Sequence, residues 1–111
     1  MAQGTETMGI MRSWQARASK VGADAYVAFF RERLAPELAR IPGYRGALVL
    51  RRTEPDAVQI TVQTFWESMD AVGRFAGANP SRAVVEGEAR AALLSFDDTV
   101  RHDEVALDSR R

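Results

Sequence analysis

Apolar and polar residues alternate with a period of two in several stretches of the chain and recur at helical spacing in others. The alternation between residues 9 and 17 predicts a first strand, with Ile10 and Trp14 on one face. A loop is expected at residues 20–22. Between residues 26 and 41 the apolar positions recur every three or four residues, which predicts an amphipathic helix. Pro42 and Gly43 then end that helix, because proline lacks an amide donor and glycine accepts the left-handed turn.

The second half of the chain begins with the pattern of a β-hairpin. A second strand is expected from about Arg45, a turn at residues 54–56 and a third strand at residues 58–66, where the alternation is regular. Ser68 is the expected N-cap of a second helix that ends at Gly77. Asn79 and Pro80 predict a fresh helical start that runs to about residue 94, and weaker alternation predicts a last strand at residues 99–107.

This order of elements, βαββαβ, predicts an α+β domain of the ferredoxin-like kind, with a four-stranded antiparallel sheet and both helices on one face. The expected organisation is a flexible leader at residues 1–8, the domain at residues 9–107 and a flexible tail at residues 108–111. The other face of the sheet, with Val49 or Phe65 on it, would be an exposed apolar patch. A second copy packed sheet to sheet would cover it, so we expect a homodimer.

The charge balance argues against two classes of partner. Fifteen Lys and Arg residues balance fifteen Asp and Glu residues, so no net field attracts nucleic acid or anionic lipid. No apolar stretch approaches the length of a membrane span, and no cysteine is present. We therefore expect no nucleic-acid partner, no membrane association and a cytoplasmic location.

No cofactor-binding motif is present in the sequence. Neither of the glycine-rich patterns that hold dinucleotides or nucleoside triphosphates occurs. With one histidine and no cysteine, the chain lacks the usual ligands of a first-row metal. We expect that any chemistry uses neither a cofactor nor a bound metal.

Two junctions resemble those of a known family. The helix-ending turn Pro42-Gly43-Tyr44-Arg45-Gly46 and the strand-to-helix junction Phe65-Trp66-Glu67-Ser68-Met69-Asp70 are similar to the corresponding elements of the antibiotic biosynthesis monooxygenase family. The resemblance implies a dimeric α/β barrel and an oxygenase, since members include quinone-forming, quinol and haem-degrading oxygenases. The haem-degrading branch has an asparagine and a haem-ligating histidine where this chain has Trp14 and residues 81–86, so haem is not expected.

Two residues are the candidates for catalysis. The resemblance assigns Trp66 to the family's tryptophan, whose indole N–H would hold a substrate oxygen or polarise dioxygen. The alternative for Trp66 is a core residue at the end of the sheet. His102 has the one side chain whose ordinary pKa lies near neutrality, which suits it to removing a phenolic proton. The alternative for His102 is a structural or surface residue.

Four further residues are candidates for substrate binding. Trp14, Phe30 and Val62 would form the apolar wall of a pocket, or else plain core. Arg45 would stabilise an enolate or phenolate, or else lie exposed beside a turn.

The predicted function is therefore a cofactor-independent monooxygenase that oxidises an electron-rich aromatic substrate, such as a phenol, quinol or anthrone-like ring, with dioxygen. The alternative is a non-catalytic dimeric α/β-barrel protein that binds a small hydrophobic ligand. Trp66 and His102 pointing into one accessible cavity would favour the enzyme. A space filled by Trp14 and Phe30 would favour the alternative.

Overall fold

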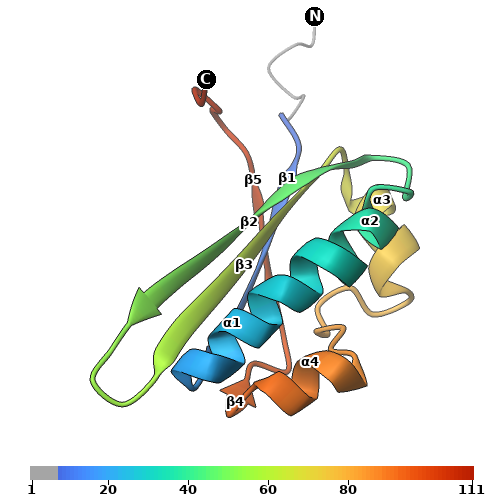
Figure 1. Ribbon diagram of the computed structural model, residues 1–111. Coiled ribbons are helices and arrows are strands. Elements are labelled where there is room, and N and C mark those ends of the chain that lie inside the picture. The colour runs from blue at the N-terminus through green and yellow to red at the C-terminus, as the bar shows by residue number, and fades with distance from the viewer. Residues whose placement is uncertain (1–7) are drawn as a thin grey trace, which may run out of the picture.

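The computed structural model describes residues 8–111 and shows one antiparallel sheet with all of its helices on one side (Figure 1). The elements follow in the order β1 (Ile10–Ala18), α1 (Lys20–Phe29), η2 (Phe30–Leu34), α2 (Ala35–Leu38), β2 (Tyr44–Thr53), β3 (Val58–Trp66), α3 (Met69–Ala76), α4 (Gly87–Ala92), β4 (Ser95–Phe96) and β5 (Arg101–Glu104). This is the α+β, ferredoxin-like class that the sequence predicts.

The strands lie in the order β2-β3-β1-β4, and β5 also pairs with β1. β1 therefore lies between β3 and the last part of the chain, as the predicted topology requires. The predicted final strand at residues 99–107 is too long, because only Arg101–Glu104 pairs with β1 in β5. A two-residue strand, β4, pairs with the other end of β1, so the fourth position in the sheet is divided between two short segments.

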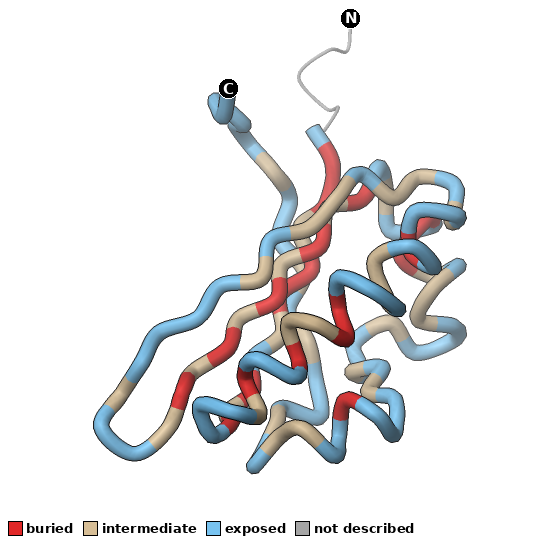
Figure 2. The backbone as a smooth tube through the Cα atoms, viewed as in Figure 1, coloured by how far each residue is buried: buried red, intermediate tan, exposed pale blue. Residues whose placement is uncertain are grey.

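The alternation of residues sorts the sheet into a covered face and an open face. In β3 the residues at even positions, from Val58 to Trp66, are all buried under the helices, and those at odd positions are partly exposed (Figure 2). Val49 lies directly opposite Val62 and packs against the same core. The expectation that Val49 belongs to the open face is therefore wrong, whereas Phe65 does lie there, opposite Met11.

The first helix begins earlier than predicted. Residues 20–22 lie in α1 and not in a loop, because the Ser19 hydroxyl accepts a hydrogen bond from the Gly22 amide at 3.0 Å and caps the helix. Gly22 is also the residue that permits the contact with α4. A Cβ at this position would lie 2.3 Å from the Ala92 carbonyl oxygen.

This helix contains a π-helical turn, η2, between α1 and α2. The turn precedes Pro36, which has no amide hydrogen and so cannot continue the hydrogen-bond ladder of an α-helix. The Ala35 amide bonds instead to the Phe30 carbonyl, five residues back. Phe29 and Phe30, at the start of this turn, are both buried.

The predicted second helical stretch at residues 79–94 is wrong over most of its length. Only Gly87–Ala92 is helical. The residues before it bond to a distant segment: the Ala83 amide donates to the Asp98 carbonyl at 2.8 Å, and the Val100 amide donates to the Ser81 carbonyl at 2.9 Å. Groups used in this way cannot enter a helical ladder.

The two ends of the domain meet at one end of the sheet (Figure 1). Residues 1–7 of the predicted leader lie outside the described residues. Met8 is attached to the fold, since its amide donates to the Val105 carbonyl at 3.2 Å. In the predicted tail, the Arg110 guanidinium lies 4.4 Å from the centre of the Phe65 ring on the open face. Among residues 8–111, no helix is long and apolar enough to cross a membrane.

Candidate functional site

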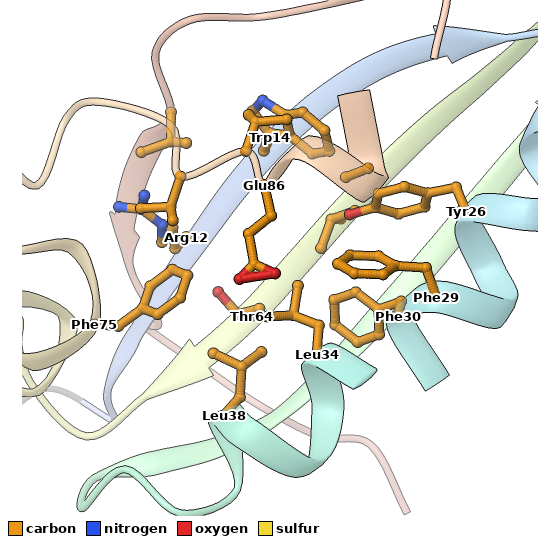
Figure 3. A pocket seen from close by; sticks show the side chains of 15 residues that line it. Arg12, Trp14, Tyr26, Phe29, Phe30, Leu34, Leu38, Thr64, Phe75 and Glu86 are labelled. Carbon is orange, nitrogen blue, oxygen red and sulfur yellow. The ribbon is translucent and has the colours of Figure 1, made fainter. Parts of the chain in front are cut away.

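A cavity with an aromatic wall lies between the covered face of the sheet and the helices (Figure 3). Its free volume is about 50 Å³. The sheet contributes both polar and apolar side chains to it, and the helices contribute apolar ones. The lining residues are Arg12, Trp14, Tyr26, Phe29, Phe30, Leu34, Leu38, Val62, Thr64, Phe75, Val84, Val85, Glu86, Ala89 and Val100.

The spacing of its apolar residues explains why one helix supplies so many of these side chains, because Tyr26, Phe29 and Phe30 are three and four residues apart and share one helix face. Phe29 and Phe30 both line the cavity. Leu34 and Leu38 continue the same face toward α2. The Tyr26 ring lies 6.0 Å from Phe29 and 6.4 Å from Phe30, so the aromatic wall is continuous.

Three of the predicted binding residues come together in this cavity. Trp14, Phe30 and Val62 all line it, and Val62 lies directly opposite Trp14 in the sheet. The Trp14 indole N–H donates to the Asp97 carbonyl at 2.7 Å, so Trp14 presents its ring and not its donor to the cavity. Arg45 lies elsewhere: it is exposed, and it donates to the Met8 carbonyl at 2.9 Å. The structure therefore separates Arg45 from the other predicted binding residues.

Trp66 does not line the cavity but contacts two residues that do, Thr64 and Phe75. It is fully buried, stacks on Phe75 with a ring separation of 5.8 Å and meets Tyr44 edge-on at 5.2 Å. Its indole N–H donates to the Thr64 hydroxyl oxygen at 2.8 Å. An indole N–H only donates, so Thr64 accepts here and keeps its own O–H proton to donate. Trp66 thus reaches the cavity through Thr64.

His102 also does not line the cavity but contacts a residue that does, Arg12. It is directly opposite Arg12 in the sheet, and its Nε2 lies 3.0 Å from Nη1 of Arg12. Because a guanidinium has no lone pair to accept a hydrogen bond, Arg12 donates and His102 carries its proton on Nδ1. Burial and the positive charge of Arg12 lower the pKa of His102 below its ordinary value, against a smaller opposite effect of Asp103.

Arg12 is a buried cation at the cavity. It donates to the carbonyl oxygens of Pro80 and Arg82 and to His102, and so fastens residues 80–82 to β1. Its guanidinium lies 5.6 Å from the centre of the Phe75 ring. No ion pair joins Arg12 to a carboxylate within the described part of the chain. Burial without such a partner lowers the pKa of Arg12 to about 10.

Glu86 is the one carboxylate among the lining residues. It is the N-cap residue of α4, but its side chain makes no capping bond. In Figure 3 the side chain extends from the loop toward Thr64 and Leu34. Because Glu86 is exposed, it lies at the mouth of the cavity and stays in contact with solvent.

The pH dependence of stability follows from the environment of His102. Because the folded state lowers the pKa of His102, the unfolded chain binds the proton more readily, and stability falls as the pH drops below the ordinary value of 6.5. We expect the urea midpoint to decrease between pH 8 and pH 5, and the decrease to be smaller in His102→Gln. An equal decrease in the variant would show that another group is responsible.

Arg12, Thr64 and Glu86 were not among the site residues predicted from the sequence. A signal was present for Arg12, since it stands at an inward position of an alternating strand, where a charged residue is unusual. The position of Glu86 depends on the loop at residues 77–86, for which the helical pattern was misleading. No group of three potential metal ligands occurs within residues 8–111.

Comparison with known structures gives the fold class. The chain is similar to the monooxygenase from the gene ActVA-Orf6 of Streptomyces coelicolor in complex with nanaomycin D, with a TM-score of 0.57 and 14% identity, over 93% of this chain and 90% of that one. It is also similar to SnoaB, a cofactor-independent oxygenase from Streptomyces nogalater, with a TM-score of 0.51 and 21% identity, over 93% of this chain and 95% of that one.

A third similar structure is from Bacillus cereus and is assigned provisionally to the antibiotic biosynthesis monooxygenases. The TM-score is 0.55 and the identity 16%, over 92% of this chain and 95% of that one. No protein-family model and no curated protein matches the sequence. The chain therefore has the fold of antibiotic biosynthesis monooxygenases.

Proposed function

We propose that the protein is a cofactor-independent monooxygenase that oxidises an electron-rich aromatic compound, such as a phenol, quinol or anthrone-like ring, with dioxygen. The observation that carries this proposal is the cavity between sheet and helices, in which aromatic rings face one buried cation and one carboxylate. The fold shared with oxygenases, one of them described as cofactor-independent, adds support. An apolar, largely enclosed space favours this chemistry because it keeps water from the reactive intermediates.

The reaction needs no reductant. Loss of a proton makes the substrate electron-rich, and the resulting anion transfers one electron to dioxygen. The two radicals then form a carbon–oxygen bond, and a proton completes a hydroperoxide. Loss of water from the hydroperoxide leaves a quinone carbonyl, so one oxygen atom enters the product and the other leaves as water.

The described geometry supports a division of these tasks. Glu86 is the carboxylate at the cavity, so we assign to it the acceptance of the substrate proton. Trp66 and His102 are one hydrogen bond away from the lining residues Thr64 and Arg12. We therefore propose that Trp66 and His102 act as positioning residues rather than as groups that touch the substrate.

The proposal is tested by oxygen uptake after treatment of the protein with a chelator. We expect uptake above the uncatalysed rate with at least one member of a panel of quinols, naphthols and anthrones. Glu86→Gln should lower kcat by about a hundredfold, the lower range for loss of a general base. The matched control is Glu88→Gln, an exposed carboxylate on α4 that pairs with Arg33 outside the cavity. No uptake by the wild-type protein on any substrate would refute the proposal.

One observation favours the alternative, a protein that binds a hydrophobic ligand without reaction. The free volume of about 50 Å³ is well below the roughly 150 Å³ of an engineered cavity that binds benzene, and Trp14 and Phe30 fill part of the space. A ring can enter only if side chains at the mouth move. Tight binding of a quinol without oxygen uptake would support this alternative.

The homodimer is a further part of the proposal. Leu48 and Leu50 on the open face of the sheet are 38% and 46% exposed, and Met11 and Phe65 extend the same face. A second copy packed on this face would bury these side chains. We expect a dimer in sedimentation equilibrium, and a shift toward monomer in Leu48→Glu. A monomeric wild-type protein at micromolar concentration would contradict it.

A further inference from the structure

The cavity lining contains two hydrogen-bond donors, Arg12 and Thr64, to which the proposed reaction assigns no ligand group. Arg12 and Thr64 are direct neighbours across β1 and β3, and both are buried, with 5% and 7% of their surface exposed. Both line the cavity. Side chains at directly opposed positions have Cβ atoms about 4.5–5.5 Å apart. The Arg12 guanidinium and the Thr64 hydroxyl are therefore both donors in the lining of one cavity.

Each of these residues retains unused donors. A guanidinium has five N–H groups, and Arg12 uses three of them on Pro80, Arg82 and His102. The Thr64 oxygen accepts the Trp66 indole proton, which leaves the Thr64 O–H to donate, and this O–H donates no hydrogen bond to Glu86 or to any other residue within residues 8–111. An unmet donor in a buried site costs free energy. A ligand that accepts hydrogen bonds would remove this cost.

The charge indicates which kind of acceptor fits. Arg12 is a buried cation, and Glu86, the exposed carboxylate at the mouth of the same cavity, is not in ion-pair contact with it, nor is any other described carboxylate. A buried charge is stable when a partner of opposite charge lies beside it. The neighbouring surface is aromatic, because Phe75 lies under the Arg12 guanidinium and the rings of α1 and η2 face it.

We propose that Arg12 and Thr64 form an anion subsite, and that the cavity selects aromatic ligands carrying an anionic oxygen, a carboxylate or a phenolate. His102 and Trp66 are its positioning residues: His102 holds the end of the guanidinium and Trp66 fixes the direction of the Thr64 hydroxyl. The subsite deepens the proposed function, because it names the charge of the substrate. It is nevertheless a statement about binding, and oxygen chemistry is not needed to test it.

Equilibrium binding of two small probes tests the subsite. Isothermal titration calorimetry compares benzoate with its neutral methyl ester at pH 7.5. We expect the wild-type protein to bind benzoate at least about tenfold more tightly, as a charge-assisted hydrogen bond predicts. Thr64→Val should lower this preference severalfold, and Thr64→Ser, which keeps the hydroxyl, should retain it.

A second pair of variants separates the subsite from a purely structural role. Arg12→Gln should bring the two affinities close to each other while the affinity for the methyl ester stays the same. Should Arg12→Gln fail to fold, the Thr64 pair carries the test. Arg33→Gln is the control, since this exposed arginine pairs with Glu88 outside the cavity and should leave the preference unchanged.

A coloured phenol extends the test to phenolates. Absorbance of 4-nitrophenol reports its ionisation, and we expect the protein to lower its apparent pKa, with a smaller shift in Thr64→Val. Equal binding of benzoate and its ester, no binding of either at millimolar concentration, or a raised pKa of nitrophenol would overturn the proposal. Preference for benzoate without oxygen uptake on any substrate would leave the subsite standing and refute only the oxygenase.

Discussion

Trp66→Ala should destabilise the protein by about 3–5 kcal/mol, the range for removing a buried aromatic side chain. The side chain is fully buried, stacks on Phe75, meets Tyr44 edge-on and donates to Thr64. Small domains have only about 5–15 kcal/mol of stability in total, so this variant would lose a large part of it. Urea denaturation followed by circular dichroism measures the change.

Trp66→Phe is the matched control for this variant. Phenylalanine keeps a ring between Phe75 and Tyr44 but cannot donate to Thr64, so we expect a smaller loss of about 1–2 kcal/mol. A loss below about 1 kcal/mol in Trp66→Ala would contradict the placement of Trp66 in the core. It would instead favour an indole that is accessible to a ligand.

Gly43→Ala should lower the stability by about 2–5 kcal/mol, because two separate costs add. Gly43 has φ +93°, a conformation that residues with a Cβ rarely adopt, in the turn between α2 and β2. A Cβ there would also lie 2.5 Å from the Cβ of Ala71 in α3. The turn and α3 would have to move apart. Thermal and urea denaturation both measure the effect.

Gly46 and Gly87 separate the two costs. Gly46 has φ +119°, but a Cβ there meets nothing within 4 Å, so Gly46→Ala carries only the backbone cost of about 1–3 kcal/mol. Gly87 has neither a positive φ nor a close neighbour, and Gly87→Ala should be neutral or slightly stabilising. Equal losses for Gly43→Ala and Gly46→Ala would show that the contact with Ala71 relaxes without cost.

The two residues predicted from the sequence to be catalytic do not line the cavity themselves. They contact two lining residues that were not predicted. Trp66 and His102 contact Thr64 and Arg12, respectively, and these lining residues are the ones a ligand can reach. The sequence-based criterion for an enzyme was that Trp66 and His102 point into one accessible cavity. Their placement behind the lining residues does not favour direct catalysis by either. It favours a cavity whose polar groups are held in place from behind, and the functional proposal rests on that arrangement.

Local sequence patterns determined those helices and strands whose hydrogen bonds form within the element or with an element close to it in the sequence. The regular alternation at residues 58–66 predicted β3 with the correct buried face, because successive side chains of a strand point to opposite sides. Ser68 was predicted as an N-cap, and its hydroxyl accepts from the Ala71 amide at 3.2 Å. The fold class followed from the order of such elements along the chain.

Only the tertiary structure decided the conformation of the loop at residues 77–86 and the contacts of the charged residue Arg12 in β1. Residues 80–83 have a helical pattern, but their backbone groups bond to Arg12, Asp98 and Val100, which local spacing cannot reveal. The same contacts bring Glu86 to the mouth of the cavity. Arg12 is separated from Pro80 by 68 residues and from His102 by 90, so its burial depends on partners that the folded sheet brings together. The sequence by itself therefore determined the class of the fold. The long-range contacts of the buried Arg12 decided where the candidate site lies.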